Sequence, residues 1–227
     1  MKSAVVTFPG SNCDRDMDVA LKKFGFKNKM VWHQDVELPK SDLVVLPGGF
    51  SYGDYLRCGI LASKSKIMQS VINFANSGGM VMGICNGFQI LVETGLVPGV
   101  LLRNKYLEFI CRNVFVKINN KNNGYFKNIR NDILELHIAH NEGNYFCTND
   151  QLKEIEDNTQ VAINYCDPEG KIEELFNPNG SIKNIAGIFN KEKNVLGMMP
   201  HPERMIDSSL SGEDGSLFFK NLINNIK

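Results

Sequence analysis

The chain carries no excess of either charge. Its 227 residues include 25 basic and 25 acidic side chains, and its pI is near 6.9. A balanced charge disfavours binding to nucleic-acid phosphates or to an anionic membrane surface. The sequence also lacks a secretory leader and any apolar run approaching the roughly 18 residues of a membrane-spanning helix. We therefore expect a cytoplasmic protein with neither a nucleic acid nor a membrane as partner.

Cysteine pairs and phosphate-binding motifs are missing as well. The six cysteines include no C-x-x-C pair. A chain of this length does not need disulfides to stabilise its core, so reduced thiols are favoured over disulfides or a zinc site. No G-x-G-x-x-G or Walker pattern is present, although these are the common signatures of dinucleotide and ATP binding. We expect neither a metal nor a cofactor in this chain.

The length and the alternation of apolar and amphipathic stretches predict a single α/β domain over residues 1–227. In the first part of the chain this alternation is typical of β-α-β units in a parallel sheet. The expected strands are 4–8, 29–32, 43–46 and 80–84. The expected helices are 14–24, 56–75 and 86–93.

The second half of the chain is richer in strand-like sequence, which we interpret as a β-rich insertion and not as a second domain. The Asn-rich segment 119–123 indicates a solvated connection between two strands. A closing helix is expected at 217–226. The expected strands of this half are 109–118, 133–139, 161–165, 185–189 and 195–199.

A candidate nucleophile follows one of the predicted strands. Cys85 lies between Gly83 and Gly87 in a G-x-C-x-G pattern, after an apolar strand and before a helix. This is the context of a nucleophile elbow, in which the glycines permit a sharp turn and the helix N-terminus favours a thiolate. On this motif alone, a buried structural cysteine stays an alternative.

A thiol that attacks an amide needs a proton carrier, and the chain has only four histidines. His201 follows the last predicted strand, so it should emerge at the same sheet edge as Cys85. Two prolines fix the backbone around it, and Glu203 can orient its imidazole and stabilise the charged form. We predict a Cys85, His201 and Glu203 triad.

The oxyanion formed by such an attack needs backbone N–H donors. The residue after the nucleophile, Asn86, and Gly49 in the turn after strand 43–46 are the candidates. Glycine-rich turns after strands are common, and a phosphate-binding loop would look similar. Gln89 lies one helical turn beyond Cys85 on the same face of the predicted helix.

Three coordinated motifs resemble those of class I glutamine amidotransferases: Pro47-Gly48-Gly49, Gly83-Ile84-Cys85-x-Gly87-x-Gln89 and His201-Pro202-Glu203. The flanking sequence is more specific and resembles the glutaminase subunits of phosphoribosylformylglycinamidine synthases, over nearly the whole chain. The stretches that carry this second resemblance are 8–14, 49–57, 102–104, 109–112 and 142–145.

The resemblance implies a flavodoxin-like fold, with a mostly parallel central sheet flanked by helices. It implies a triad of Cys85, His201 and Glu203, glutamine as substrate, and Gln89 together with Gly49 as substrate-binding residues. It also implies that ammonia passes to partner proteins in purine biosynthesis. These are a large synthetase subunit of the PurL type, which uses ATP and Mg²⁺, and a small accessory subunit of the PurS type.

One position departs from the family pattern: Asn141 stands where the family usually has glycine, in the loop before Glu142-Gly143-Asn144. The conformation of this loop is therefore an open question for the structure. Two rival functions are also open at this point. One is a flavodoxin-like cysteine peptidase or deglycase, and the other is a non-enzymatic binding module in which Cys85 is merely buried.

Overall fold

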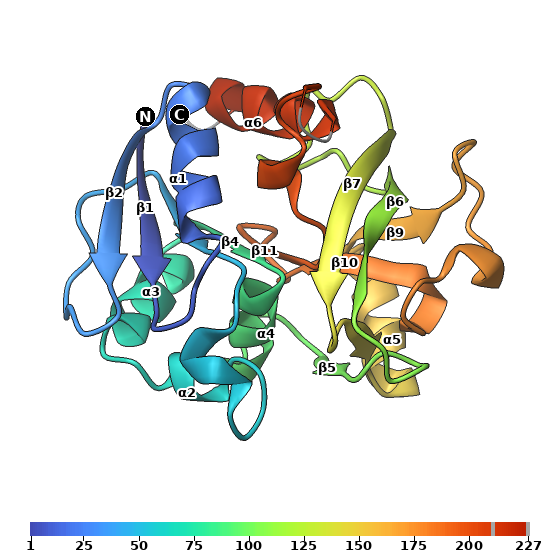
Figure 1. Cartoon of the computed structure of the whole chain (residues 1–227), viewed down its shortest axis with the longest axis horizontal. Coiled ribbons are helices and arrows are strands. Elements are labelled where there is room, and N and C mark those ends of the chain that lie inside the picture. Colours follow the sequence, from blue (N-terminus) through green and yellow to red (C-terminus); the bar gives the residue numbers. More distant parts are fainter. Residues whose placement is uncertain (210–211, 226–227) are drawn as a thin grey trace.

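The computed structural model describes residues 1–209 and 212–225, and within them nine strands form one large sheet (Figure 1). Its spatial order is β2-β1-β3-β4-β11-β10-β9-β6-β7. In chain order the strands are β1 (Lys2–Thr7), β2 (Lys27–Trp32), β3 (Leu43–Leu46), β4 (Met80–Ile84), β6 (Ile110–Ile118), β7 (Ile133–His140), β9 (Val161–Cys166), β10 (Ile185–Phe189) and β11 (Val195–Met198).

The sheet has a parallel half and an antiparallel half. Strands β2, β1, β3, β4 and β11 pair in parallel. From β11 onward, β10, β9, β6 and β7 pair antiparallel. Two antiparallel steps restore a strand's direction, so β9 and β7 run the same way as the five parallel strands, and only β10 and β6 oppose them. The predicted β-rich segment thus continues the main sheet.

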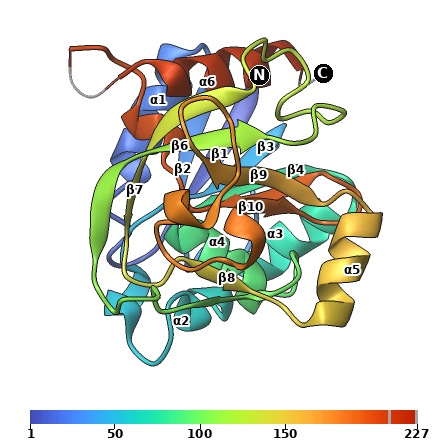
Figure 2. The same ribbon diagram turned by 90° about the vertical axis from the view of Figure 1, so that its right-hand side faces the viewer.

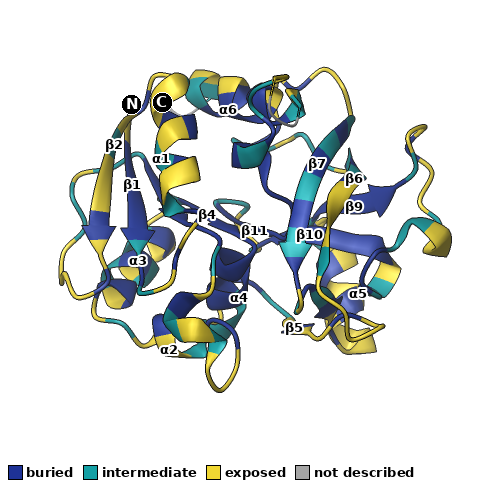
Figure 3. Cartoon of the chain, viewed as in Figure 1, coloured by how far each residue is buried: buried dark blue, intermediate teal, exposed yellow. Residues whose placement is uncertain are grey.

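Helices cover both faces of this sheet, as the α/β prediction requires. Figures 1 and 2 show α1 (Asp14–Lys23) and α6 (Asp214–Asn225) on one face and α3 (Ile67–Asn76), α4 (Asn86–Glu93) and α5 (Asn149–Asp157) on the other. The central strands are buried, whereas the outer faces of the helices are exposed (Figure 3). The α/β fold class with helices flanking a central sheet is confirmed.

The core favours a single domain, which nevertheless stays a prediction. Buried apolar side chains form one continuous cluster from Ala4 to Leu222. Within the described ranges, no helix combines the length and apolar character needed to cross a membrane.

The single helix predicted at 56–75 was wrong. The chain instead forms a short helix α2 (Ile60–Ser63) and, after a break, α3. Leu56 has a left-handed φ of 68° and is 87% exposed, so the apolar residues at the start of the predicted helix lie in a loop. At the break, the Ser63 hydroxyl donates to the carbonyl of Ile60, a local bond that competes with helix propagation.

Several short or polar elements were not predicted. Helix α5 begins with a capping box in which Thr148 and Gln151 bond each other's backbone N–H groups, a signal visible in the sequence. Strands β5 (Val100–Leu102) and β8 (Asn144–Phe146) form a separate small sheet. Helix α6 begins three residues before the predicted 217, and its predicted last residue, 226, lies outside the described residues.

The Asn-rich segment 119–123 does connect two strands, β6 and β7, as predicted. The same connection also carries Tyr125, which is fully buried and whose hydroxyl shares its one proton between the carbonyls of Val81 and Asn194, each at 2.7 Å. The connection is therefore anchored to β4 and to the residue before β11.

Helix α4 lies against strand β3 with no side chain between them at Gly87. A Cβ at Gly87 would lie 1.9 Å from the carbonyl oxygen of Leu46. A Cβ at Gly83 would in turn lie 2.6 Å from the carbonyl oxygen of Gly87. Both glycines of the elbow motif are thus required by close backbone approach.

We expect Gly87→Ala to lower the free energy of unfolding by about 2–3 kcal/mol, because the helix must move away from β3 to admit the methyl group. Alanine favours helices over glycine, so a loss at this position reports the clash alone. Urea denaturation measures the change. Gly124→Ala is the matched control, since its Cβ meets only the flexible end of Met80. Equal losses in the two variants would contradict the close-packing argument.

Candidate active site

Cys85 occupies a sharp turn between β4 and α4. Its backbone has φ 50° and ψ −106°, outside the usual regions for a non-glycine residue. Such strain persists only where the surroundings impose it, and here the Cys85 N–H donates to the carbonyl of Met198 on β11 at 2.8 Å. The side chain is 5% exposed, and its sulfur lies 3.6 Å from the carbonyl oxygen of Ala139. The predicted nucleophile elbow is therefore present.

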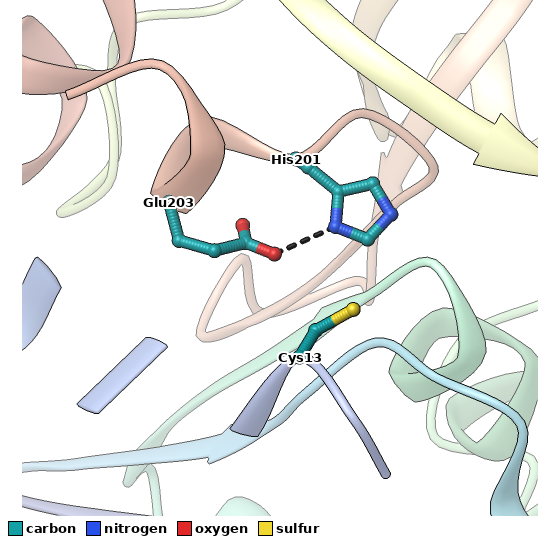
Figure 4. Close-up of side chains that lie close together, drawn as sticks. All are labelled: Cys13, His201 and Glu203. Carbon is teal, nitrogen blue, oxygen red and sulfur yellow. Dashed lines mark hydrogen bonds and ion pairs between the residues drawn. The ribbon is translucent and has the colours of Figure 1, made fainter. Parts of the chain in front are cut away.

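His201 and Glu203 form a buried pair just beyond β11. The Nδ1 atom of His201 lies 2.6 Å from Oε1 of Glu203, and both side chains are almost fully buried (Figure 4). The His201 N–H donates to the carbonyl of His137 on β7 at 2.8 Å, which fixes the loop. Among the described residues, Nε2 of His201 has no hydrogen-bond partner. This nitrogen is left for the thiol and the substrate.

Electrostatics favour a charged imidazole at His201. Burial disfavours the imidazolium, but the carboxylate of Glu203 and the nearby thiol of Cys85 outweigh it, so the pKa of His201 is raised. Strand β7 (Ile133–His140) contacts both Cys85 and His201, since its Ala139 carbonyl lies 3.6 Å from the Cys85 sulfur and its His137 carbonyl accepts the His201 N–H. The structure thus brings the three predicted catalytic residues together.

Strand β7 borders the site and contacts both Cys85 and His201. It is the last strand of the sheet, yet its His137 carbonyl holds the His201 backbone and its Ala139 carbonyl approaches the sulfur of Cys85. The sheet must therefore curl so that its antiparallel edge returns to the carboxyl ends of β4 and β11.

The two predicted oxyanion donors border the same elbow. Gly49 has φ 138°, and a Cβ there would lie 2.7 Å from the backbone nitrogen of Asn12, so only glycine fits. Asn86 is the first residue of α4, where backbone N–H groups have no intrahelical acceptor. Its side chain accepts the N–H of Ser51 at 3.2 Å, which ties the loop after Gly49 to the helix.

Gln89 is almost buried beside the elbow. Its Oε1 accepts from Nδ2 of Asn86 and its Nε2 donates to the carbonyl of Glu142, each at 2.8 Å. These bonds fix the amide and leave one proton and one lone pair for a ligand. A substrate-binding role for Gln89 and Gly49 fits this placement and stays a prediction.

The loop that carries the departure from the family pattern keeps an ordinary conformation. Asn141 is exposed, and it is not among the residues with a left-handed φ, so its backbone does not require glycine. Its carbonyl accepts the N–H of Asn104 at 2.9 Å. Gly143 packs against the ring of His140, where a Cβ would lie 2.5 Å from the ring atoms. The substitution at Asn141 thus leaves the loop anchored.

Burial also sets the protonation state of His140, which lies at the end of β7 beside this loop. It lowers the pKa of His140 to about 3, so this imidazole is neutral at physiological pH. Its Nδ1 lies 3.1 Å from Oδ1 of Asn104, which also accepts the N–H of Gly143. His140 therefore shapes the loop and does not compete with His201 as the proton carrier.

Cys13 and Arg204 lie at this site although neither was predicted from the sequence as a site residue. The sulfur of Cys13 lies against the His201–Glu203 pair, with the ligand atoms of the three residues within 4.8 Å of one another (Figure 4). Nη2 of Arg204 donates to this sulfur at 3.0 Å. Cysteine, histidine and glutamate are zinc ligands. Here the guanidinium of Arg204 already supplies the positive charge that a metal ion would bring, which disfavours a zinc site. We interpret the cluster as a hydrogen-bonded assembly. In the sequence, only the family-like stretch 8–14, which contains Cys13, could have indicated this cluster.

Comparison with known proteins identifies the class of this α/β chain with its cysteine elbow. The family model of the CobB/CobQ-like glutamine amidotransferase domain matches residues 1–212. The chain therefore belongs to the glutamine amidotransferase family.

Individual relatives are more specific. The chain is 78% identical over 227 residues to the phosphoribosylformylglycinamidine synthase subunit PurQ of Pelagibacter ubique (strain HTCC1062), and the match covers 100% of both chains. It is 49% identical to the PurQ subunit of Gloeobacter violaceus, covering 98% of this chain and 97% of that one. A chain of the solved structure of PurLQS from Thermotoga maritima matches with a TM-score of 0.88 at 39% identity, covering 100% and 99%. The family resemblance inferred from the motifs is confirmed.

The charge of Glu203 sets how strongly His201 holds its proton. We expect Glu203→Gln to lower the pKa of His201, because the neutral amide no longer offsets the burial of the imidazolium. NMR titration of the His201 ring measures this shift. Glu135→Gln, on the outer part of β7, is the control and should leave the titration in place. An unchanged His201 pKa in Glu203→Gln would refute the electrostatic coupling.

Proposed function

We propose that this chain is the glutaminase subunit of a phosphoribosylformylglycinamidine synthase, which releases ammonia from glutamine for purine biosynthesis. The observation that carries the proposal is the Cys85 elbow facing the buried His201–Glu203 pair. The 78% identity to a PurQ subunit over the full length supports the choice of acceptor reaction. Family membership favours this activity over a peptidase, a deglycase or a binding module with a structural cysteine.

The first half of the reaction forms a thioester. The Cys85 thiolate attacks the carboxamide carbon of glutamine, and the N–H groups of Gly49 and Asn86 stabilise the resulting oxyanion. His201, held protonated by Glu203, donates its proton to the departing nitrogen. The C–N bond breaks, ammonia leaves, and a γ-glutamyl thioester remains on Cys85.

The second half regenerates the enzyme. His201, now neutral, accepts a proton from a water that attacks the thioester carbon. The second oxyanion occupies the same site between Gly49 and Asn86. Collapse breaks the C–S bond and releases glutamate, while the imidazolium and the Cys85 thiolate return to their starting states. Glu203 keeps the imidazole oriented in both halves.

Ammonia must reach its acceptor without taking up a proton, because ammonium has no lone pair with which to attack. We therefore propose docking to a large PurL-type synthetase subunit, which uses ATP and Mg²⁺, and a small PurS-type subunit. That this chain itself needs no cofactor stays a prediction. The match to a chain of PurLQS supports these partners. A cytoplasmic location fits the six free cysteines.

Cys85→Ser should abolish glutamine-dependent synthesis by the complex and leave ammonia-dependent synthesis intact, because only the ammonia source is removed. Glutamate release and acceptor amidination are measured side by side. Cys166→Ser, which alters another buried thiol, serves as the control. Retained glutamine-dependent turnover by the Cys85 variant would eliminate the proposed nucleophile.

The isolated chain should be a poor glutaminase that is activated in the complex, since uncoupled hydrolysis would waste ammonia. The measurement is glutamate release by the chain alone and then with both partner subunits, nucleotide and formylglycinamide ribonucleotide. Equal rates would argue against coupling. Full activity with an unrelated synthetase would argue against the proposed acceptor.

A further inference from the structure

Cys13 joins three parts of the chain that lie far apart in sequence. It is the N-cap residue of α1 and is 3% exposed. Its backbone N–H donates to the carbonyl of Gly48 at 3.3 Å, and its sulfur accepts from Nη2 of Arg204 at 3.0 Å. The residue therefore contacts the turn that carries the oxyanion donor and the segment that carries the proton carrier.

The turn before Cys13 also supports the oxyanion turn directly. The carbonyl of Gly10 accepts the N–H of Phe50 at 2.9 Å, and the backbone of Ser11 and Asn12 fills the space where a Cβ of Gly49 would stand. The orientation of the Gly49 N–H thus depends on how the β1–α1 connection is placed.

On the opposite side, Arg204 links the catalytic segment to the same helix end. Besides its bond to Cys13, its Nε lies 3.5 Å from Oδ2 of Asp16 in the first turn of α1. Arg204 is adjacent to Glu203 in sequence, so these two anchors on α1 fix the backbone that presents the Glu203 carboxylate.

The environment keeps the Cys13 thiol neutral. Burial, reinforced by the charge of Glu203, raises its pKa to about 12. A neutral thiol can accept from Arg204 while its own proton points to Oδ1 of Asn12, 3.7 Å away. Cys13 and His201 can both lie close to position 48 because that residue is glycine. A Cβ there would lie 3.3 Å from the Cys13 sulfur and 2.6 Å from Cε1 of His201.

We propose that Cys13 is a positioning residue for the glutaminase reaction. Its thiol and backbone fix the Gly48–Gly49 turn and the His201–Glu203 pair in position relative to one another. This inference rests on the function proposed above. Cys13 acts through Gly49 and Glu203, and among the described residues no hydrogen bond joins it to Gln89, the predicted substrate-binding residue on α4.

The test is Cys13→Ala in the complete complex with both partner subunits. We expect kcat for glutamine hydrolysis to fall about tenfold with KM for glutamine nearly unchanged, because one charge-assisted bond that orients the catalytic segment is lost. Cys13→Ser keeps an acceptor for Arg204 and should recover kcat to within about threefold of the wild type. Cys147→Ala removes an equally buried thiol outside the site and should have no effect.

A double-mutant cycle separates positioning from general packing. If Cys13 works through Arg204, then Cys13→Ala should reduce kcat little further in an Arg204→Gln background. Additive losses, a rise in KM without a fall in kcat, or a lower melting temperature with unchanged kcat would each overturn the proposal. Should Cys13→Ala not fold, Arg204→Gln removes the same bond: it should lower kcat about tenfold with KM nearly unchanged, and adding Cys13→Ser should change kcat no further.

Failure of this inference can be told from failure of the proposed function. Ammonia-dependent synthesis should be unaffected in every Cys13 variant, since the synthetase is untouched. Loss of the Cys13 effect while Cys85→Ser still abolishes glutamine use would reject the positioning role alone. Glutamine use that survives Cys85→Ser would reject the function on which the role rests.

Discussion

The position of the nucleophile depends on one close contact between backbones, the approach of Gly87 in α4 to the Leu46 carbonyl in β3. This contact lets α4 begin close to the sheet, directly after β4. The chain must therefore turn from strand to helix within one residue. Cys85 is that residue, and its left-handed φ is the local cost. The strain is held by the N–H bond from Cys85 to Met198, which locks the elbow to the neighbouring strand. Packing of the core therefore decides where the sulfur points.

A second constraint is the burial of an ionic pair. Placing His201 and Glu203 out of water is costly, and breaking such a pair by removing one partner leaves an uncompensated charge. The structure offsets this cost with a short hydrogen bond, a flanking guanidinium from Arg204 and a backbone fixed by two prolines. The same separation from water that makes burial of the pair costly strengthens the effect of the Glu203 charge on the pKa of His201.

Much of this could be predicted from sequence because it depends on local patterns. The elbow at Cys85, the histidine after the last parallel strand and the oxyanion turn at Gly49 each follow from residues that are neighbours in the chain. The curled antiparallel half could not be predicted, since the pairing of β7 at the sheet edge and its return to His201 are set by long-range packing. Cys13 and Arg204 are 191 residues apart, and no periodicity connects them. The helix predicted at 56–75 was wrong for a different reason: the Ser63 hydroxyl and a left-handed Leu56 outweighed an apolar pattern.

The curl of the sheet has a mechanical consequence. Strand β7 holds the His201 backbone through His137 and approaches the sulfur of Cys85 through Ala139, two residues further on. Its other edge pairs along its whole length with β6, whose outer residues from Cys111 to Asn113 are exposed. A displacement of that exposed strand would therefore reach the His201 backbone and the Cys85 sulfur through the β6–β7 ladder, with no intervening loop. The β6–β7 hairpin thus joins a solvent-exposed surface directly to the residues around Cys85 and His201.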